Sequence, residues 1–228
     1  MTSCVVFEEQ IEVPFVRSLA EFRAWTMTDG FPDCGRIDYL AGRIEVDMSP
    51  EDFFCHGVLK TEIVRVLAQI VEGADAGYLL TDRTRISCPA ADLSVEPDVV
   101  FISHESLDTG RVRLVAKVSG EPGRYMEVEG APDLIVEIVS DRSVTKDTCR
   151  LPAAYWEAGV REFWLVDARG EVLKFDILRP GPAGYQPSPV DAEGYGNSAV
   201  FGVRFQLSRR RDAHGRWKFD LRPMRAEG

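Results

Sequence analysis

The sequence of 228 residues contains few cysteines and no closely spaced pair of them. The five cysteines are scattered along the chain and odd in number. This pattern excludes a disulfide framework and a structural zinc site, which need cysteines in pairs. Unpaired cysteines are typical of a reducing compartment, so we expect a cytoplasmic protein. The cysteines are Cys4, Cys34, Cys55, Cys88 and Cys149.

Long apolar runs are also missing. No stretch approaches the roughly 18 to 20 uninterrupted apolar residues that a membrane helix needs. The opening residues, MTSCVVFEEQ, lack the basic start and apolar core of a secretion signal. The sequence has no glycine-rich phosphate loop and no Ser-His-Asp order. We therefore expect no membrane partner and look for function among other polar residues.

Positive charge is scarce over most of the chain. The formal net charge is −10 and the sequence pI is about 4.9, which argues against non-specific binding of nucleic acid through the whole surface. The exception is the arginine-rich segment 204–225, RFQLSRRRDAHGRWKFDLRPMR. Two interpretations stay open for this segment: a solvated hairpin that balances an acidic body, or a local patch that faces phosphate.

The hydrophobic pattern alternates between helical and strand periods. Apolar residues recur at helical spacing from His56 to Glu72, with a face wide enough to cover a sheet. Another helix is predicted from Thr148 to Ala158, ended by Gly159. A capping box at Ser18-Leu-Ala-Glu21 predicts a short helix before these two. Strands or hairpins are expected in 35–50, 78–87, 97–103, 132–140, 161–178 and the C-terminal segment, which turns near 214–215.

This order of elements predicts a mixed α/β (α+β) fold, in which helices flank a central sheet and β-hairpins lie toward both ends of the chain. The apolar run at 134–139 indicates a central strand that is covered on both faces. We expect residues 1–228 to form one domain.

One residue in that central strand is out of place. PDLIVEIVS places Glu137 inside an apolar run, and an ionised carboxylate in a packed sheet costs several kcal/mol unless a cation pairs with it. Asp98, in VEPDVVFI, begins another strand, so the two carboxylates could converge on one Mg²⁺ ion. A plain buried salt bridge is the alternative for Glu137, and Asp133 is expected only to mark the start of its strand.

Three further residues are candidates for the same site. Lys146 and Arg150 follow Glu137 and stand four apart, so they share a face if both are helical. A cation there could stabilise developing negative charge, or the two residues could form an ordinary exposed pair. His56 begins the long helix and is either a polar group near the metal or a surface histidine.

These residues together resemble a known family. PDLIVEIVS, then Tyr155, Glu157-Ala-Gly-Val160 and Arg-Glu-Phe-Trp-Leu-Val-Asp167, is similar to the Uma-two family of restriction endonucleases, in the PD-(D/E)xK nuclease superfamily. Met48-Ser-Pro50, His56 and Pro97-Asp98-Val fit the same pattern. The resemblance implies a restriction-endonuclease-like fold, with a nuclease-like core at about 20–176 and a C-terminal hairpin extension at about 177–228.

The resemblance also implies a Mg²⁺- or Mn²⁺-dependent phosphodiesterase. Asp98 and Glu137 match the metal-binding residues, the expected partner is nucleic acid, in particular DNA, and similar nucleases often work as homodimers. The superfamily lysine would stand at Val139, and the shifted lysine of this family at Leu151. Lys146 could reach in instead, Arg150 could substitute, or the site could be impaired. The competing hypotheses are therefore an endonuclease, a catalytically degenerate module that binds nucleic acid or protein, and a structural oligomer with Glu137 in a buried salt bridge.

Overall fold

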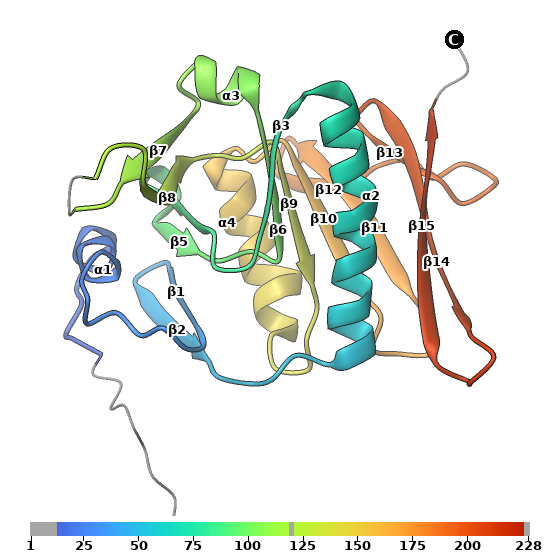
Figure 1. The fold of residues 1–228 in the computed structure, drawn as a ribbon, viewed down its shortest axis with the longest axis horizontal. Coiled ribbons are helices and arrows are strands. Elements are labelled where there is room, and N and C mark those ends of the chain that lie inside the picture. Colours follow the sequence, from blue (N-terminus) through green and yellow to red (C-terminus); the bar gives the residue numbers. More distant parts are fainter. Residues whose placement is uncertain (1–12, 119–120, 226–228) are drawn as a thin grey trace, which may run out of the picture.

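The computed structural model describes residues 13–118 and 121–225. Its β-structure is divided among three sheets rather than gathered in one, and two of them are six-stranded. The mixed α/β fold predicted from the sequence is confirmed (Figure 1). In the order of their pairing, the strands of the first sheet are β2 (Arg43–Asp47), β1 (Arg36–Leu40), β5 (Leu93–Val95), β4 (Arg85–Cys88), β8 (Tyr125–Gly130) and β7 (Val112–Ala116).

The second sheet contains the central strand predicted from the sequence. Its strands, in order, are β12 (Gly184–Pro187), β11 (Lys174–Gly181), β10 (Glu162–Asp167), β9 (Leu134–Ile138), β6 (Val99–Ser103) and β3 (Gly77–Thr81). β9 runs parallel to β10 and antiparallel to β6, and every residue of β9 is buried. The third sheet consists of β13 (Gly196–Ser198), β14 (Val203–Arg211) and β15 (Trp217–Arg225).

Helices cover both faces of the second sheet. The helices are α1 (Leu19–Thr26), α2 (Leu59–Ala74), α3 (His104–Asp108) and α4 (Leu151–Ala158), with a short 3-10 turn η2 (Pro89–Ala91). The apolar face of α2 packs on Val136 and Trp164 in one core, whereas α4 packs on Ile135 and Phe163 in another. In Figure 1, α2 and α4 lie on opposite sides of β9 and β10.

The predicted helices around 56–72 and 148–158 both exist, but each begins with a π-helical turn. The turn η1 (Phe53–Val58) precedes α2, and the turn η3 (Lys146–Arg150) precedes α4. Asp52 caps η1 by accepting hydrogen bonds from two backbone N–H groups. Gly159 ends α4 in the left-handed conformation at φ 83°, where a residue without Cβ meets no steric penalty. Single π-turns inside helices often mark functional sites.

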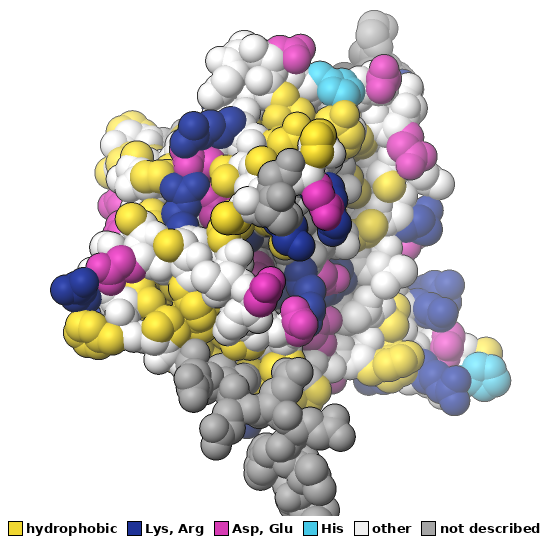
Figure 2. Space-filling view, turned by 60° about the vertical axis from the view of Figure 1, so that its left-hand side comes forward, with side chains coloured by type: hydrophobic (Ala, Val, Ile, Leu, Met, Phe, Trp, Pro, Cys, Tyr) yellow, Lys and Arg dark blue, Asp and Glu magenta, His cyan; other side chains and the backbone are white. Residues whose placement is uncertain are grey.

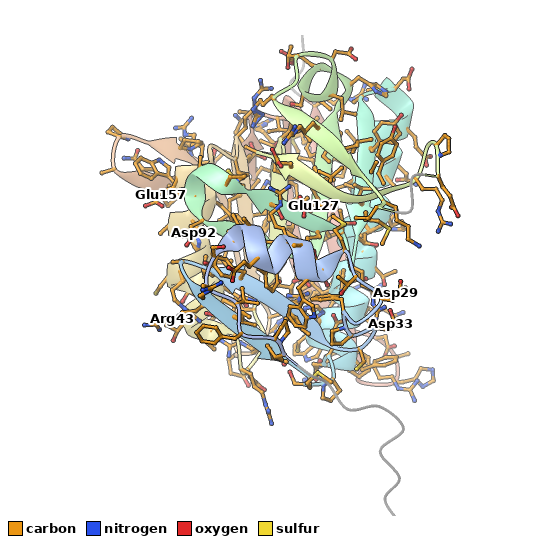
Figure 3. All side chains as sticks on the ribbon, turned by 90° about the vertical axis from the view of Figure 1, so that its left-hand side faces the viewer. Asp29, Asp33, Arg43, Asp92, Glu127 and Glu157 are labelled. Atoms are coloured by element: carbon orange, nitrogen blue, oxygen red, sulfur yellow. The ribbon has the colours of Figure 1, made fainter. Side chains whose placement is uncertain are left out.

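The N-terminal helix lies across the first sheet. Ser18 caps α1 as predicted, and the buried side chains of Phe22 and Trp25 pack on Ile37 and Tyr39 of β1. Figure 3 looks onto this face and shows α1 in front of the sheet, with Glu127 behind the helix. Both hairpins predicted from the sequence, β1–β2 and β14–β15, are present.

Within the described ranges, none of the helices combines the length and apolarity needed to cross a membrane. The proposed division into a core at 20–176 and an extension at 177–228 stays a prediction.

Candidate metal centre

The pairing of β6 with β9 brings the two predicted carboxylates together. Val99 pairs with Val136 in the antiparallel register, so one step further along the chains Asp98 lies opposite Glu137. Asp98 is 0% exposed and Glu137 is 2% exposed. Asp98 Oδ2 accepts a 2.7 Å hydrogen bond from the backbone N–H of Ile138, which holds the carboxylate beside the end of β9.

Arg36 lies between these carboxylates. Its Nη2 is 2.7 Å from Asp98 Oδ1, and its Nη1 is 3.9 Å from Glu137 Oε2. Burial opposes ionisation of Asp98, but the contact with His56 and the charge of Arg36 hold its pKa well below the usual range. Burial and the charge of Asp98 raise the pKa of Glu137 well above its usual value. Asp98 is therefore the carboxylate that ionises first.

Tyr155 on α4 supports Glu137 from the opposite side. Its hydroxyl donates a 2.6 Å hydrogen bond to Glu137 Oε1, and its side chain is fully buried. Burial, followed by the charge of Glu137, raises the pKa of the Tyr155 phenol well above its usual value. Tyr155 therefore stays a hydrogen-bond donor, and it fixes one oxygen of Glu137 while the other faces Arg36.

The turn η1 presents His56 to Asp98. His56 Nε2 lies 3.3 Å from Asp98 Oδ2, and His56 Nδ1 lies 3.0 Å from Glu51 Oε2. The histidine is only 5% exposed, yet its buried Nδ1 forms no hydrogen bond of acceptable geometry among the described residues. One ligand atom from each of Glu51, His56 and Asp98 can be chosen so that all lie within 4.8 Å of one another, so this set could hold a metal ion.

Lys60 follows His56 by one helical turn and adds charge to the same group. Its Nζ lies 2.8 Å from Glu51 Oε1 and 3.8 Å from Asp98 Oδ1. It also bonds to Asp82 at 2.7 Å. Because this lysine is already shared among three carboxylates, its main effect is to fix Glu51 and Asp82 at the mouth of the site.

Of the two candidate cations after Glu137, Lys146 lines the cleft and Arg150 lies elsewhere. Lys146 pairs with the buried Asp38 of β1. Burial lowers the pKa of Lys146, but Asp38 outweighs it and raises that pKa above the usual value. Arg150 is 42% exposed at its side chain and pairs with Glu45 of β2.

The two positions where relatives would carry a lysine are part of the core. Val139 is 2% exposed and Leu151 is 1% exposed, and Leu151 packs with Ile135 and Tyr155. Val139 also lines the hollow of about 490 Å³ described below, so only Leu151 is enclosed entirely by the core. Among the candidates named from the sequence, Lys146 is the lysine that lies in the cleft.

A cleft opens over these residues. Its volume is about 240 Å³, and its lining includes Arg36, His56, Ser140 and Lys146. A second hollow of about 490 Å³ adjoins it, since both are lined by Ser49, Pro50, Glu51, His56 and Ser140. The cleft also carries four acidic side chains, Asp47, Glu51, Asp82 and Glu96, so it is a mixed-charge site rather than a purely basic one.

Sequence reasoning missed Arg36, Asp38, Glu51, Lys60 and Tyr155. Two signals could have found part of the set. Arg36 and Asp38 alternate on β1 with the buried Ile37 and Tyr39, so they share the opposite face of that strand. Lys60 stands four residues after His56, which places both on one side of the helix start.

Comparisons with known proteins bear on the fold and the family of the chain. A search of curated proteins gave no match. A solved structure, described as the crystal structure of a putative nuclease belonging to DUF820 from Anabaena variabilis ATCC 29413, aligns with a TM-score of 0.58 and 21% identity, over 81% of this chain and 90% of that one. This likeness shows a shared fold. The Uma2 family, described as "Putative restriction endonuclease", matches residues 19–209, and the chain therefore belongs to the Uma2 family.

Proposed function

We propose that this protein is a Mg²⁺- or Mn²⁺-dependent endonuclease that hydrolyses phosphodiester bonds, with DNA as its substrate. The observation that supports the proposal is that Asp98 and Glu137 are buried opposite each other on neighbouring strands, next to a cleft that His56 and Lys146 line, with His56 in contact with Asp98. Membership of the Uma2 family supports the same reaction class. The homodimer and the cytoplasmic location expected from the sequence belong to this proposal.

The donor atoms in the cleft fit a divalent cation. Buried His56 Nδ1 has no hydrogen-bond partner in the described part of the chain, and carboxylate oxygens are the ligands that Mg²⁺ and Mn²⁺ prefer. Asp98 is common to both possible ligand sets: Glu137 completes one, and Glu51 with His56 completes the other. Arg36 occupies the gap between Asp98 and Glu137, so the second set needs less rearrangement.

Each residue then has a role of its own. A bound cation would offset charge on the phosphate and activate water for attack. Lys146 and Arg36 line the cleft and would stabilise negative charge that develops on the phosphate oxygens. Tyr155 holds Glu137 in position through its hydrogen bond. Arg36 cannot act as a base because a guanidinium keeps its proton.

A cleavage assay tests the proposal. The protein is incubated with plasmid DNA, single-stranded DNA and RNA in Mg²⁺ or Mn²⁺, with chelator as the blank. We expect cleavage that disappears with chelator and in Asp98→Asn, while Arg150→Gln, which alters an exposed ion pair outside the cleft, cleaves as the unchanged protein does. Cleavage that persists in Asp98→Asn contradicts the assigned site.

Two observations favour the second candidate function, a degenerate nuclease fold that binds without cutting. Arg36 already pairs with Asp98 and lies 3.9 Å from Glu137. Val139 and Leu151 fill the positions where the resemblance would place the lysine. The same assay separates the two, because a degenerate protein binds nucleic acid and shows neither cleavage nor Mn²⁺ binding by calorimetry.

A further inference from the structure

The C-terminal hairpin carries a cluster of cations at its tip. Arg210 of β14 is paired directly with Lys218 of β15, and both side chains are exposed. Like charges directly opposite each other destabilise a hairpin. Arg211 and Arg216 are exposed beside them, and Figure 2 shows Lys and Arg side chains gathered on this projecting end, at the lower right.

The acidic residues of the hairpin neutralise this tip only in part, since the backbone hydrogen bond from Arg216 and then the charges of Arg216 and Lys218 help to lower the pKa of one aspartate, Asp212. Asp212 accepts hydrogen bonds from the backbone N–H groups of His214 and Arg216, so it serves the turn. Asp220 pairs with Arg222 at 2.6 Å. Within residues 13–118 and 121–225, none of the side chains of Arg210, Lys218 and Arg216 lies within 4 Å of a carboxylate oxygen. A hairpin that merely balanced an acidic body would place its cations against acids.

A stacked core holds the tip in a fixed shape. The guanidinium carbons of Arg209 and Arg211 lie 4.2 and 3.7 Å from the ring centroid of Trp217, within the range of cation–π attraction. Arg209 also donates hydrogen bonds to the carbonyl oxygens of Ala168 at 2.9 Å and Gly170 at 2.6 Å. The hairpin is therefore anchored to the chain that follows β10, and its charges are preorganised.

This anchor places the hairpin beside the cleft. Arg169, between the two carbonyls that bind Arg209, lines the hollow of about 490 Å³ that adjoins the site, as do Cys55 and Arg142. Burial raises the pKa of the Cys55 thiol, and the nearby charge of Arg209 opposes that rise. Leu221 of β15 donates its N–H to Glu62 of α2 at 3.1 Å. Arg142 and Arg169 thus lie between the cleft and the hairpin, although Arg169 is itself paired with Asp141 and Asp167.

We propose that the tip of the β14–β15 hairpin is a docking arm that binds the phosphate backbone of a polynucleotide and leads the strand into the cleft. This proposal rests on the proposed function, since it assigns the partner of the same site. The chemistry is that of cation-to-phosphate contact, which carries no base specificity. On a chain with a net charge of −10, such an arm supplies a local positive surface.

Binding measurements test the arm separately from catalysis. Fluorescence anisotropy is recorded for labelled duplex DNA, single-stranded DNA and RNA with the full chain in chelator, so that no cleavage occurs. The test variant is Arg210→Gln/Lys218→Gln. The control is Arg113→Gln/Arg124→Gln, which removes two exposed arginine charges from the β7–β8 hairpin on the other side of the molecule (Figure 1).

We expect the test variant to bind at least tenfold more weakly and the control to bind within twofold of the unchanged protein. The slope of log K against log salt on duplex DNA should become shallower by about 2, close to 0.9 for each lost phosphate contact. A loss confined to one class of polynucleotide supports the arm and identifies its substrate. Equal affinity and slope in the test variant overturn the proposal, as does a lack of binding by the unchanged protein.

Failure of the arm and failure of the nuclease give different results. If the protein never cleaves in Mg²⁺ or Mn²⁺ but the hairpin variant loses binding, the docking arm stands and the endonuclease does not. If the protein cleaves and the hairpin variant binds normally, the endonuclease stands and the arm does not. Far-ultraviolet circular dichroism and thermal unfolding of both variants show whether the exposed substitutions leave the fold intact.

Discussion

The two ends of strand β9 carry buried carboxylates in opposite circumstances. Asp133, just before the strand, is 1% exposed, and Glu137, near its end, is 2% exposed. Asp133 accepts hydrogen bonds from Ser103 N–H, Ser106 Oγ, Arg111 and Arg161, at 2.8 to 3.3 Å. Glu137 accepts one, from Tyr155 at 2.6 Å, and its nearest cation is 3.9 Å away.

This difference separates a structural carboxylate from a functional one more clearly than burial does. Asp133 ties α3 and the β7 end of the molecule to β9, and three of its four hydrogen bonds come to one oxygen, Oδ1. Glu137 keeps acceptor capacity beside the cleft. An active-site residue often contributes less to the stability of the protein than a structural residue would at the same position, because its surroundings serve function rather than stability.

The largest expected effect concerns activity. We expect Glu137→Gln to reduce cleavage by at least about 100-fold, since it removes a carboxylate that would hold the cation with Asp98. Asp133→Asn should retain cleavage when the rate is divided by the fraction of folded protein. Initial rates on plasmid DNA, with the folded fraction from circular dichroism, measure both. Equal losses in the two variants would remove the distinction drawn here.

The next effect is on stability, with the order reversed. Asp133→Asn leaves two arginines without their shared anion and should lower the free energy of unfolding by about 2–4 kcal/mol. Glu137→Gln keeps an acceptor for Tyr155 and removes a buried charge close to Asp98, so its change should stay within about 1 kcal/mol. Urea unfolding at pH 7 compares the two. A larger loss in Glu137→Gln than in Asp133→Asn would contradict the assignment of Asp133 as the structural group.

Tyr155→Phe sharpens the comparison by removing the one hydrogen bond to Glu137. The loss should cost about 1–2 kcal/mol in the free energy of unfolding, because a buried acceptor is left unsatisfied. The matched control is Tyr185→Phe, which removes a 2.8 Å hydrogen bond to the carbonyl of Val160 away from the cleft. Cleavage should fall in Tyr155→Phe alone, and a similar fall in both variants would show that the effect is not specific to Glu137.

A third buried carboxylate, Asp147 in η3, makes the free energy of unfolding depend on pH. Burial raises its pKa from 3.8 to about 6, so the folded protein binds this proton more tightly than the unfolded chain does. Its contribution to stability is present below about pH 4 and is lost as pH rises to about 6. Asp147→Asn should therefore be close to the unchanged protein at pH 4 and exceed it by up to about 3 kcal/mol at pH 7. Thermal unfolding from pH 4 to 7 measures the difference, and a constant offset would contradict it.

The sequence predicted the carboxylate pair for a physical reason. A charged residue inside a continuous apolar strand contradicts its surroundings, and a Pro-Asp start on a second strand offered a partner. Lys146 and His56 were candidates because they lie close in sequence to predicted helix starts. The main helices and both hairpins followed from periodicity and turn residues.

What the sequence could not supply were contacts between distant strands. Arg36 donates a hydrogen bond to Asp98, 62 residues away in the sequence. No local sequence pattern indicates that β1 lies close to the start of β6. Asp133 was expected only to mark a strand start, but Arg111 and Arg161 reach it from separate segments. The π-turns at η1 and η3 also escaped prediction, since helical periodicity tolerates one extra residue.

Arg36 affects the stability that we expect of the folded protein when the proposed metal ion is absent. In an empty metal site, two neighbouring carboxylates repel each other. Folding of such a site is then coupled to binding of the ion. Here the chain supplies its own stand-in cation, 2.7 Å from Asp98. We expect exhaustive chelation to lower the thermal unfolding midpoint only by the amount that metal binding adds, and to lower it further in Arg36→Met. The concentration of metal would then control the activity of the protein, whereas its folding and its lifetime in the cell would depend little on the metal.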